Sequence, residues 1–111
     1  MTKKVLGYKW EDIAKNYYLE QWYQLLDQNR TIRWWELDLV FEKNNELVFC
    51  EIKVVDNTDD IFGYITKKKL NFLSKTIQYY VFDKSVDKDF RLDIVFIKDW
   101  SVFEIFKNID L

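Results

Sequence analysis

Two acidic residues and one lysine stand close together in neighbouring apolar segments of the chain. Asp38 lies in one segment, and Glu51 and Lys53 lie in the next. Mg²⁺ and Mn²⁺ prefer carboxylate and carbonyl oxygens as ligands, and the backbone carbonyl of Ile52 stands beside Glu51. Such an ion lowers the pKa of water and stabilises charge on a phosphate oxygen. These residues therefore predict a divalent-metal site that hydrolyses a phosphodiester, with Lys53 orienting the water or helping to deprotonate it.

A hairpin is the element that must position these side chains. Residues 36–41 alternate between polar and apolar types, and residues 46–55 form a mostly apolar run. The turn-forming pair Asn44-Asn45 joins the two segments, which is typical of a two-residue β-hairpin. In that hairpin, residues whose numbers sum to 89 face one another, so Asp38 faces Glu51.

The same register places Glu36 across from Lys53, and the two-residue side-chain period puts all four charges on one face. Facing carboxylates cost about 0.2 to 1 kcal/mol when exposed and more when desolvated, and a bound cation would offset that cost. Two alternatives remain open. The cluster is also what an ordinary solvated sheet face looks like. A three-residue turn would shift the register by one and place the carboxylates on opposite faces.

The composition excludes several kinds of chemistry. The chain of 111 residues contains no histidine and a single cysteine, Cys50. Histidine-dependent nucleophiles, the usual zinc enzymes, an internal disulfide and a thiolate zinc cluster are therefore excluded. Cys50 alternates away from Glu51 and is expected to be buried and unreactive. The net charge of −2 gives no general affinity for DNA, so any DNA contact must use a local basic patch.

The remaining pattern predicts one domain, residues 1–111, of the α/β or α+β class, with helices packed against a sheet. Apolar residues recur at helical spacing from about residue 8 to 20, with Glu11 at the margin of the stripe, and again from about residue 65 to 82. Short apolar runs predict three more strands, the first of them at a sheet edge, at residues 22–33, 91–97 and 101–106.

The chain is expected to be cytoplasmic, without membrane attachment. No apolar run approaches the roughly 20 residues of a membrane helix, and the start, MTKKVLGYKWED, lacks the apolar stretch of a secretory signal. A hydrophobic content of 49% with 32% charged residues is that of a folded, soluble domain.

Two groups of basic residues are candidates for nucleic-acid binding. Arg30 and Arg33 flank the strand that leads to the acidic residues, where they can hold a backbone phosphate. Lys67, Lys68 and Lys69 form the densest basic cluster, and cations at the start of a helix oppose its dipole, which indicates contact with phosphate. An ordinary solvated surface is the alternative interpretation of both groups.

Several short motifs follow one another in a particular order, at Gly7, Glu11, Tyr18-Leu19, Asn29, Glu36-Leu37-Asp38-Leu39, Glu51-Ile52-Lys53, Phe62-Gly63 and Arg91-Leu92-Asp93. Over nearly the whole chain this order resembles the YraN-like family, small bacterial proteins within the PD-(D/E)XK nuclease superfamily. The resemblance implies a restriction-endonuclease-like αβββαβ core, a central mixed sheet flanked by helices. It also implies Asp38 and Glu51 as ligands of Mg²⁺ or Mn²⁺, Lys53 as the catalytic lysine, and Glu11 as a further ligand or water-positioning group.

Archaeal Holliday-junction resolvases are similar in that core, so the resemblance implies a structure-selective DNA nuclease. The sequence departs from the family at three places. Trp35 and Trp22 stand where the family has glycine, and Val54-Val55 follow the lysine where a polar or basic residue is usual. One of the adjacent pair Trp34 and Trp35 is expected in the core, and the other beside the acidic patch. Asp93 is expected to have a structural hydrogen-bonding role.

Three hypotheses follow from these patterns. The first is a metal-dependent endonuclease that acts on DNA, with branched DNA as its sharpest substrate expectation. The alternative is a catalytically inactive module that retains the nuclease fold and binds nucleic acid or protein. The third is a scaffold that forms a homodimer through its exposed aromatic residues.

Overall fold

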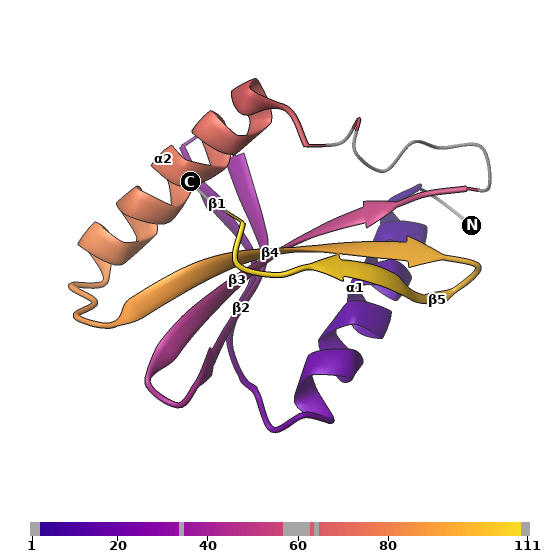
Figure 1. The fold of residues 1–111 in the computed structure, drawn as a ribbon, viewed down its shortest axis with the longest axis horizontal. Helices are drawn as coiled ribbons and strands as arrows, with labels where there is room; N and C mark the ends of the chain where they lie inside the picture. The colour runs from indigo at the N-terminus through magenta and orange to yellow at the C-terminus, as the bar shows by residue number, and fades with distance from the viewer. Residues whose placement is uncertain (1–2, 34, 57–62, 64, 110–111) are drawn as a thin grey trace.

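Seven helices and strands follow one another in the order that the sequence predicts (Figure 1). The computed structural model describes residues 3–33, 35–56, 63 and 65–109. Within them the elements are α1 (Lys3–Leu19), β1 (Gln24–Ile32), β2 (Trp35–Lys43), β3 (Glu46–Val54), α2 (Lys67–Asp83), β4 (Asp89–Lys98) and β5 (Ser101–Phe106). Trp34 and Phe62, which were singled out in the sequence, lie outside the described residues.

The five strands form one sheet in the order β1-β2-β3-β4-β5. β3 and β4 pair in parallel, while the other neighbouring strands pair antiparallel. A parallel pair needs a long crossover, and the segment that contains α2 supplies it. The mixed sheet confirms the predicted α+β class and is consistent with a restriction-endonuclease-like core.

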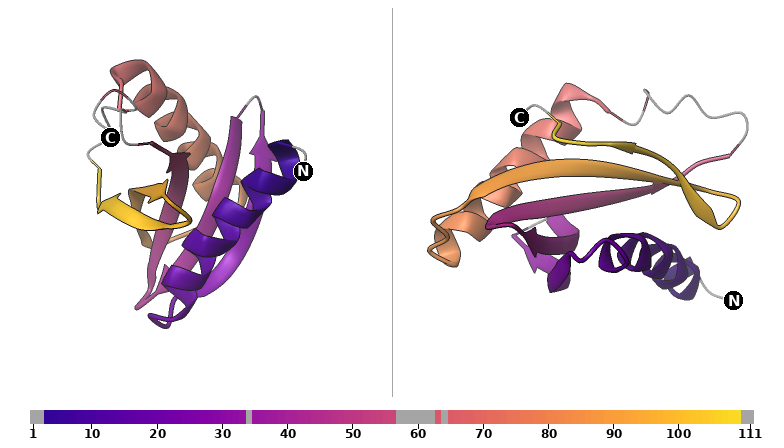
Figure 2. Two further views of the ribbon diagram at one scale, coloured as in Figure 1. Left: turned by 90° about the vertical axis from the view of Figure 1, so that its right-hand side faces the viewer. Right: turned by 60° about the horizontal axis from the view of Figure 1, so that its bottom comes forward.

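The two helices cover opposite faces of this sheet (Figure 2). Strand alternation divides the buried side chains, because in β3 Leu47 and Phe49 pack on the side of α2 while Val48 and Cys50 pack on the side of α1. The α1 side is filled by Ala14, Tyr18, Leu39, Phe41, Val48, Cys50, Val95 and Ile97. Burying one Val, Leu, Ile or Phe side chain in this way stabilises the fold by roughly 1.5 to 3 kcal/mol.

The hairpin between β2 and β3 has the predicted two-residue turn. Asn44 and Asn45 have φ angles of 52° and 64°, the left-handed conformation that a type I′ turn requires and that asparagine tolerates well. Lys43 therefore pairs with Glu46, and the register in which numbers sum to 89 is confirmed as far as Leu39 and Cys50.

The ladder between β2 and β3 ends at Leu39 and Cys50, one residue before the predicted Asp38–Glu51 pair. Beyond that point β2 continues to pair with β1, and β3 continues to pair with β4. Figure 1 shows the two strands diverging after their shared stretch at the hairpin. We call this divergence the fork. Asp38 and Glu51 are the first residues on its two sides, so the predicted cross-strand pairing of Glu36 with Lys53 does not form.

The boundaries of the helices differ slightly from the predicted ones. α1 begins at Lys3, earlier than the predicted start near residue 8. α2 begins after Thr66, whose side-chain oxygen accepts the backbone N–H of Lys69 at 3.2 Å. This is an ordinary helix N-cap. None of the described helices is long and apolar enough to cross a membrane.

Candidate metal centre

Three carboxylates from two elements meet beside the fork. Glu11 of α1 and Glu36 and Asp38 of β2 each offer one oxygen, and the three oxygens lie within 4.8 Å of one another. We call these residues the acidic triplet. Glu11 and Asp38 are half-buried, and Glu36 is exposed. Carboxylates this close repel one another unless they are protonated or share a cation.

Asp38 is held at the fork by the opposite strand. Its Oδ2 accepts the backbone N–H of Ile52 at 2.8 Å, so this carboxylate takes the place of a ladder hydrogen bond. Burial and the charges of Glu51 and Glu11 together raise the pKa of Asp38 to about 8, against the opposing effects of the Ile52 N–H and Lys53. A metal ion at Asp38 would therefore compete with a proton for the same oxygens.

Glu51 and Lys53 form an ion pair on the other side of the fork. The Glu51 side chain is 8% exposed, and its Oε1 lies 3.1 Å from Nζ of Lys53. Burial raises the pKa of Glu51, an effect that the charge of Lys53 and hydrogen bonds with Lys53 and Asp38 oppose. Glu51 is therefore not on an ordinary solvated sheet face, the alternative interpretation of its sequence pattern. It adjoins Asp38 but is not a member of the acidic triplet.

Glu11 reaches the site because α1 packs its apolar stripe on the sheet and leaves Glu11 at the stripe's margin, as predicted. Burial raises the pKa of Glu11, and hydrogen bonds from Asn29 and Gln28 oppose that effect. Two buried oxygens, Oε2 of Glu11 and Oδ1 of Asn29, have no hydrogen-bond partner among the described residues. Buried polar atoms are rarely left unpaired, so both oxygens are available to a bound water or a cation.

The donors at the fork fit a hard divalent cation. The acidic triplet and Glu51 offer carboxylate oxygens, and the unpaired oxygen of Asn29 adds an amide carbonyl. Mg²⁺ and Mn²⁺ are bound by oxygen donors of this kind. Cys50, the only cysteine, is 3% exposed, and burial raises the pKa of its thiol, so it stays protonated.

The predicted basic residues lie along α2 and the end of β1. Arg33 is exposed, with its guanidinium carbon 4.3 Å from the centre of the Tyr79 ring, and Arg30 is half-buried beside it on β1. The three lysines occupy the first turn of α2; Lys67 and Lys68 are exposed, whereas Lys69 is half-buried. The two groups of cations therefore lie toward different ends of α2: the lysines are in its first turn, whereas Arg33 contacts Tyr79 and shares a hollow with Arg30, Phe82 and Asp83 near the C-terminal end.

Asp93 has the structural role that the sequence predicts. It is fully buried and accepts hydrogen bonds from the Tyr18 hydroxyl at 2.7 Å, from Nε of Arg91 at 3.1 Å and from the backbone N–H of Asn108 at 3.0 Å. Burial raises the pKa of the Tyr18 hydroxyl, so it remains a donor. The Arg-x-Asp motif therefore joins α1 to β4 instead of contributing to the metal centre.

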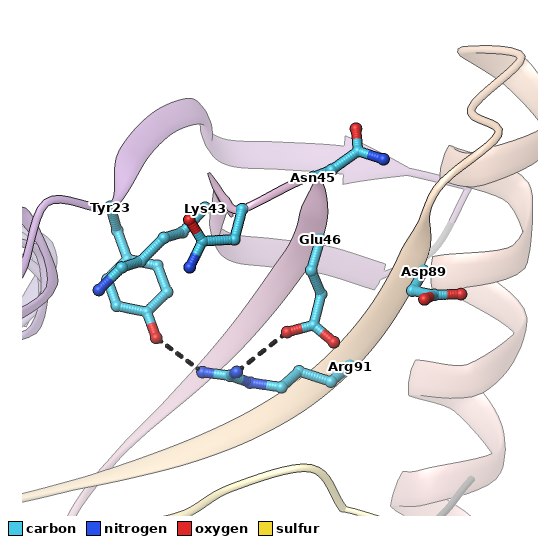
Figure 3. A pocket seen from close by; sticks show the side chains of 7 residues that line it. Tyr23, Lys43, Asn45, Glu46, Asp89 and Arg91 are labelled. Carbon is cyan, nitrogen blue, oxygen red and sulfur yellow. Dashed lines mark hydrogen bonds and ion pairs between the residues drawn. The ribbon is translucent and has the colours of Figure 1, made fainter.

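Arg91 also lines a polar pocket of about 410 Å³ at the hairpin end of the sheet (Figure 3). It donates to the Tyr23 hydroxyl and to Glu46, each at 3.0 Å, and Lys43 donates to the backbone carbonyl of Gln21 at 2.7 Å. Because these cations are already paired, the pocket is part of the framework. Its lining residues are Tyr23, Lys43, Asn44, Asn45, Glu46, Asp89 and Arg91.

Comparison with known proteins identifies the family. Residues 10–97 match the model described as "Uncharacterised protein family UPF0102". The chain belongs to UPF0102. A UPF0102 protein of Campylobacter jejuni subsp. doylei is 30% identical over 99 residues, 89% of this chain and 88% of the relative. One from Vibrio parahaemolyticus is 33% identical over 104 residues, 88% of this chain and 84% of the relative. UPF0102 is the YraN family, a member of the PD-(D/E)XK-like nuclease superfamily, so the resemblance read from the motifs is confirmed.

The sequence did not predict two features of this UPF0102 protein. Asn29 was recognised only as a family motif, yet it places an unpaired buried oxygen beside Glu11. No role was predicted for the aromatic residues Phe72, Tyr79 and Phe82, which are exposed on α2. The signal in the sequence is that all three fall outside the apolar spacing of this helix, whose buried positions are Leu73, Thr76, Ile77 and Tyr80.

Proposed function

We propose that this chain is a metal-dependent endonuclease that hydrolyses DNA phosphodiester bonds, with branched DNA as the sharper substrate hypothesis. The observation that carries the proposal is the meeting, at one fork in the sheet, of the acidic triplet with the buried Glu51–Lys53 ion pair. Membership of a PD-(D/E)XK-like family adds support for the reaction class.

Asp38 and Glu51 are the proposed principal ligands of Mg²⁺ or Mn²⁺, with the backbone carbonyl of Ile52 as a third donor and Glu11 as a further one. The N–H of Ile52 fixes the Asp38 carboxylate at 2.8 Å, so this ligand is oriented before any ion arrives. When bound, a hard divalent cation supplies Lewis acidity, which stabilises negative charge on a phosphate oxygen and lowers the pKa of water.

Lys53 is the proposed catalytic residue on the protein side. Its amine is held 3.1 Å from Glu51 and is only 24% exposed, so it stays close to the carboxylates at a defined position. There it can orient a water and donate a hydrogen bond to a phosphate oxygen as charge develops. Glu11 has an unpaired oxygen and a pKa raised by burial, which suit it to position the water and accept its proton. Glu36 stands at the exposed mouth of the site.

Cleavage assays test the proposal directly. Purified protein is mixed with Mg²⁺ or Mn²⁺ and with branched, nicked, duplex and single-stranded DNA. We expect cleavage that EDTA abolishes and that Asp38→Asn or Lys53→Ala lowers about a hundredfold or more. Lys107→Ala, which removes an exposed lysine on the described surface, is the matched control and should cut like wild type.

The outcome separates an enzyme from a binding module. If no DNA is cut, or if Lys53→Ala cuts as well as wild type, the enzymatic proposal fails. Salt-sensitive DNA binding that survives the double change Asp38→Asn with Glu51→Gln, in a protein that cuts nothing, would favour the inactive module. Sedimentation with and without DNA identifies a homodimer in either case.

A further inference from the structure

A second surface, distinct from the acidic residues, combines open aromatic rings with cations. A groove of about 480 Å³ runs between α2 and the ends of β1 and β2, lined by Ile32, Arg33, Trp35, Phe72, Lys75, Thr76 and Tyr79. It continues into a hollow of about 430 Å³ that shares Ile32, Arg33 and Tyr79 and adds Arg30, Thr31, Phe82 and Asp83. We call the two together the α2 groove.

The aromatic side chains of the α2 groove follow one another along the helix. Trp35 and Phe72 stack with their ring centres 5.9 Å apart and their planes 5° from parallel. Phe72, Tyr79 and Phe82 are 41%, 43% and 85% exposed. None belongs to the buried stripe of α2, so the fold does not need their rings. Exposed aromatic faces are surfaces on which unpaired bases stack.

The charges of the α2 groove are mostly positive. The groove is lined by three cations, Arg30, Arg33 and Lys75, and by one carboxylate, Asp83, although the whole chain carries a net charge of −2. None of the three cations forms an ion pair with another described residue. Arg33 lies 4.3 Å above the centre of the Tyr79 ring, an arrangement in which one ring and one cation can meet a base and its phosphate together.

We propose that the α2 groove binds an unpaired strand of DNA through its aromatic rings and cations. This inference rests on the proposed nuclease function and adds a preference for substrates with a single-stranded stretch. Trp35 packs on the α2 face of the sheet, whereas Glu36, the next residue of the strand, joins Glu11 of α1 on the other face, so the groove is a surface separate from the acidic triplet. From Phe72 to Phe82 the helix rises about 15 Å, room for about four nucleotides at roughly 3.4 Å each.

Other occupants fit the groove less well. Bases inside a duplex are already stacked on one another, so a duplex offers phosphates to the cations but no free base to the rings. A second copy of the chain docked through the same face would bring two positive patches together, which is unfavourable. An unpaired strand satisfies the rings and the cations at once.

Binding without metal tests the groove separately from cleavage. Fluorescent oligodeoxythymidine of about twelve nucleotides is titrated with protein in EDTA, and anisotropy gives the Kd. We expect Tyr79→Ala and Phe82→Ala each to raise the Kd about fivefold or more. Arg33→Ala should also raise the Kd, and it should reduce the slope of log affinity against log salt by about one unit, because one phosphate contact is lost. Phe103→Ala on β5, which removes an aromatic ring of similar exposure (49%), is the matched control and should bind like wild type.

The possible outcomes are distinct. The inference is overturned if the groove variants bind oligodeoxythymidine as tightly as wild type, or if Phe103→Ala weakens binding as much as they do. It is also overturned if the protein binds duplex DNA more tightly than single-stranded DNA, or binds oligouridine more tightly than oligodeoxythymidine. A self-association in sedimentation that Phe82→Ala abolishes would overturn it as well. If oligodeoxythymidine binding depends on Tyr79 and Phe82 but no DNA is ever cut, the groove stands and the nuclease proposal falls. If DNA is cut and the groove variants bind oligodeoxythymidine as wild type does, the nuclease proposal stands and the groove inference falls.

Discussion

At the scale of single residues, the candidate site is a place where the ligand-free protein prefers to hold protons. Asp38, Glu51 and Glu11 all have a pKa that burial raises above the ordinary carboxyl value. A bound proton and a bound cation are alternative ways to neutralise the same oxygens. Stability, metal affinity and pH are therefore coupled at this site, and each can be measured without knowing the substrate.

The first prediction concerns stability without metal. The pKa of Asp38 is raised to about 8 in the folded state from 3.8. A raised carboxyl pKa stabilises the folded state fully below the unfolded pKa, and this contribution is lost as pH rises through the folded one. In EDTA, the free energy of unfolding should fall by about 1 to 3 kcal/mol between pH 4 and pH 8. Urea denaturation at a series of pH values measures it.

Asp38→Asn provides the comparison, because the amide oxygen can still accept the Ile52 N–H while the group no longer titrates. The pH-dependent decline should be largely removed in this variant and retained in Asp87→Asn, which changes an exposed carboxylate. A wild type with the same pH profile as Asp38→Asn would show that Asp38 is ionised throughout.

The second prediction concerns the metal itself. Calorimetric titration of wild type with Mn²⁺ near pH 7 should show one saturable site that Asp38→Asn abolishes and Glu11→Gln weakens. Because the ion displaces the proton of Asp38, the heat should differ between buffers of different ionisation enthalpy. Heat that is unchanged in Asp38→Asn would place the ion elsewhere, and heat that is independent of buffer would mean that no proton is released.

At the scale of elements, the hairpin shows how far the sequence determines the site. The pair Asn44-Asn45 predicts the turn type, and the turn type predicts the register, which the structure confirms up to Leu39 and Cys50. The fork was not predictable from local pattern, because it arises where β2 stays with β1 and β3 stays with β4. Its consequence is that Asp38 bonds to the backbone of β3 and meets Glu11, instead of simply facing Glu51.

The third prediction concerns the attachment of α1, the helix that carries Glu11. Tyr18→Phe removes the 2.7 Å hydrogen bond to the fully buried Asp93 while keeping the ring. It should lower the free energy of unfolding by about 1 to 3 kcal/mol, because a buried carboxylate loses a donor. Tyr17→Phe, at an exposed position, should change it by less than about 0.5 kcal/mol. Chemical denaturation measures both, and equal effects would contradict the structural role of Asp93.

At the scale of the whole molecule, charge is distributed unevenly over an acidic chain. Seventeen cations and nineteen carboxylates give the net charge of −2, yet Lys67, Lys68 and Lys69 gather at the start of α2, and Arg30 and Arg33 lie by its C-terminal part. The basic residues could be picked out from the sequence. Their aromatic neighbours could not, since Trp35 meets Phe72 and Arg33 meets Tyr79 only when α2 folds back over the ends of β1 and β2.

The fourth prediction tests the lysine cluster on this basis. Changing Lys67, Lys68 and Lys69 together to alanine should weaken DNA binding uniformly across sequences and reduce the slope of log affinity against log salt by up to about two to three units. The unfolding free energy should hardly change. These lysines lie in the first turn of α2, where cations oppose the helix dipole, so their charges do not stabilise the helix. An unaltered salt slope would assign the cluster to the solvated surface.

The buried carboxylate of Asp93 has a consequence for the order in which the protein is made. It connects Tyr18, in the first helix, to a strand that is synthesised some seventy residues later, and it also accepts the backbone N–H of Asn108. Until that strand has left the ribosome, the helix that brings Glu11 to its neighbours can pack only on β2 and β3 and lacks its buried hydrogen bond to Asp93. A partly translated chain therefore carries the hairpin with Asp38 and Glu51 before α1 has its full set of contacts.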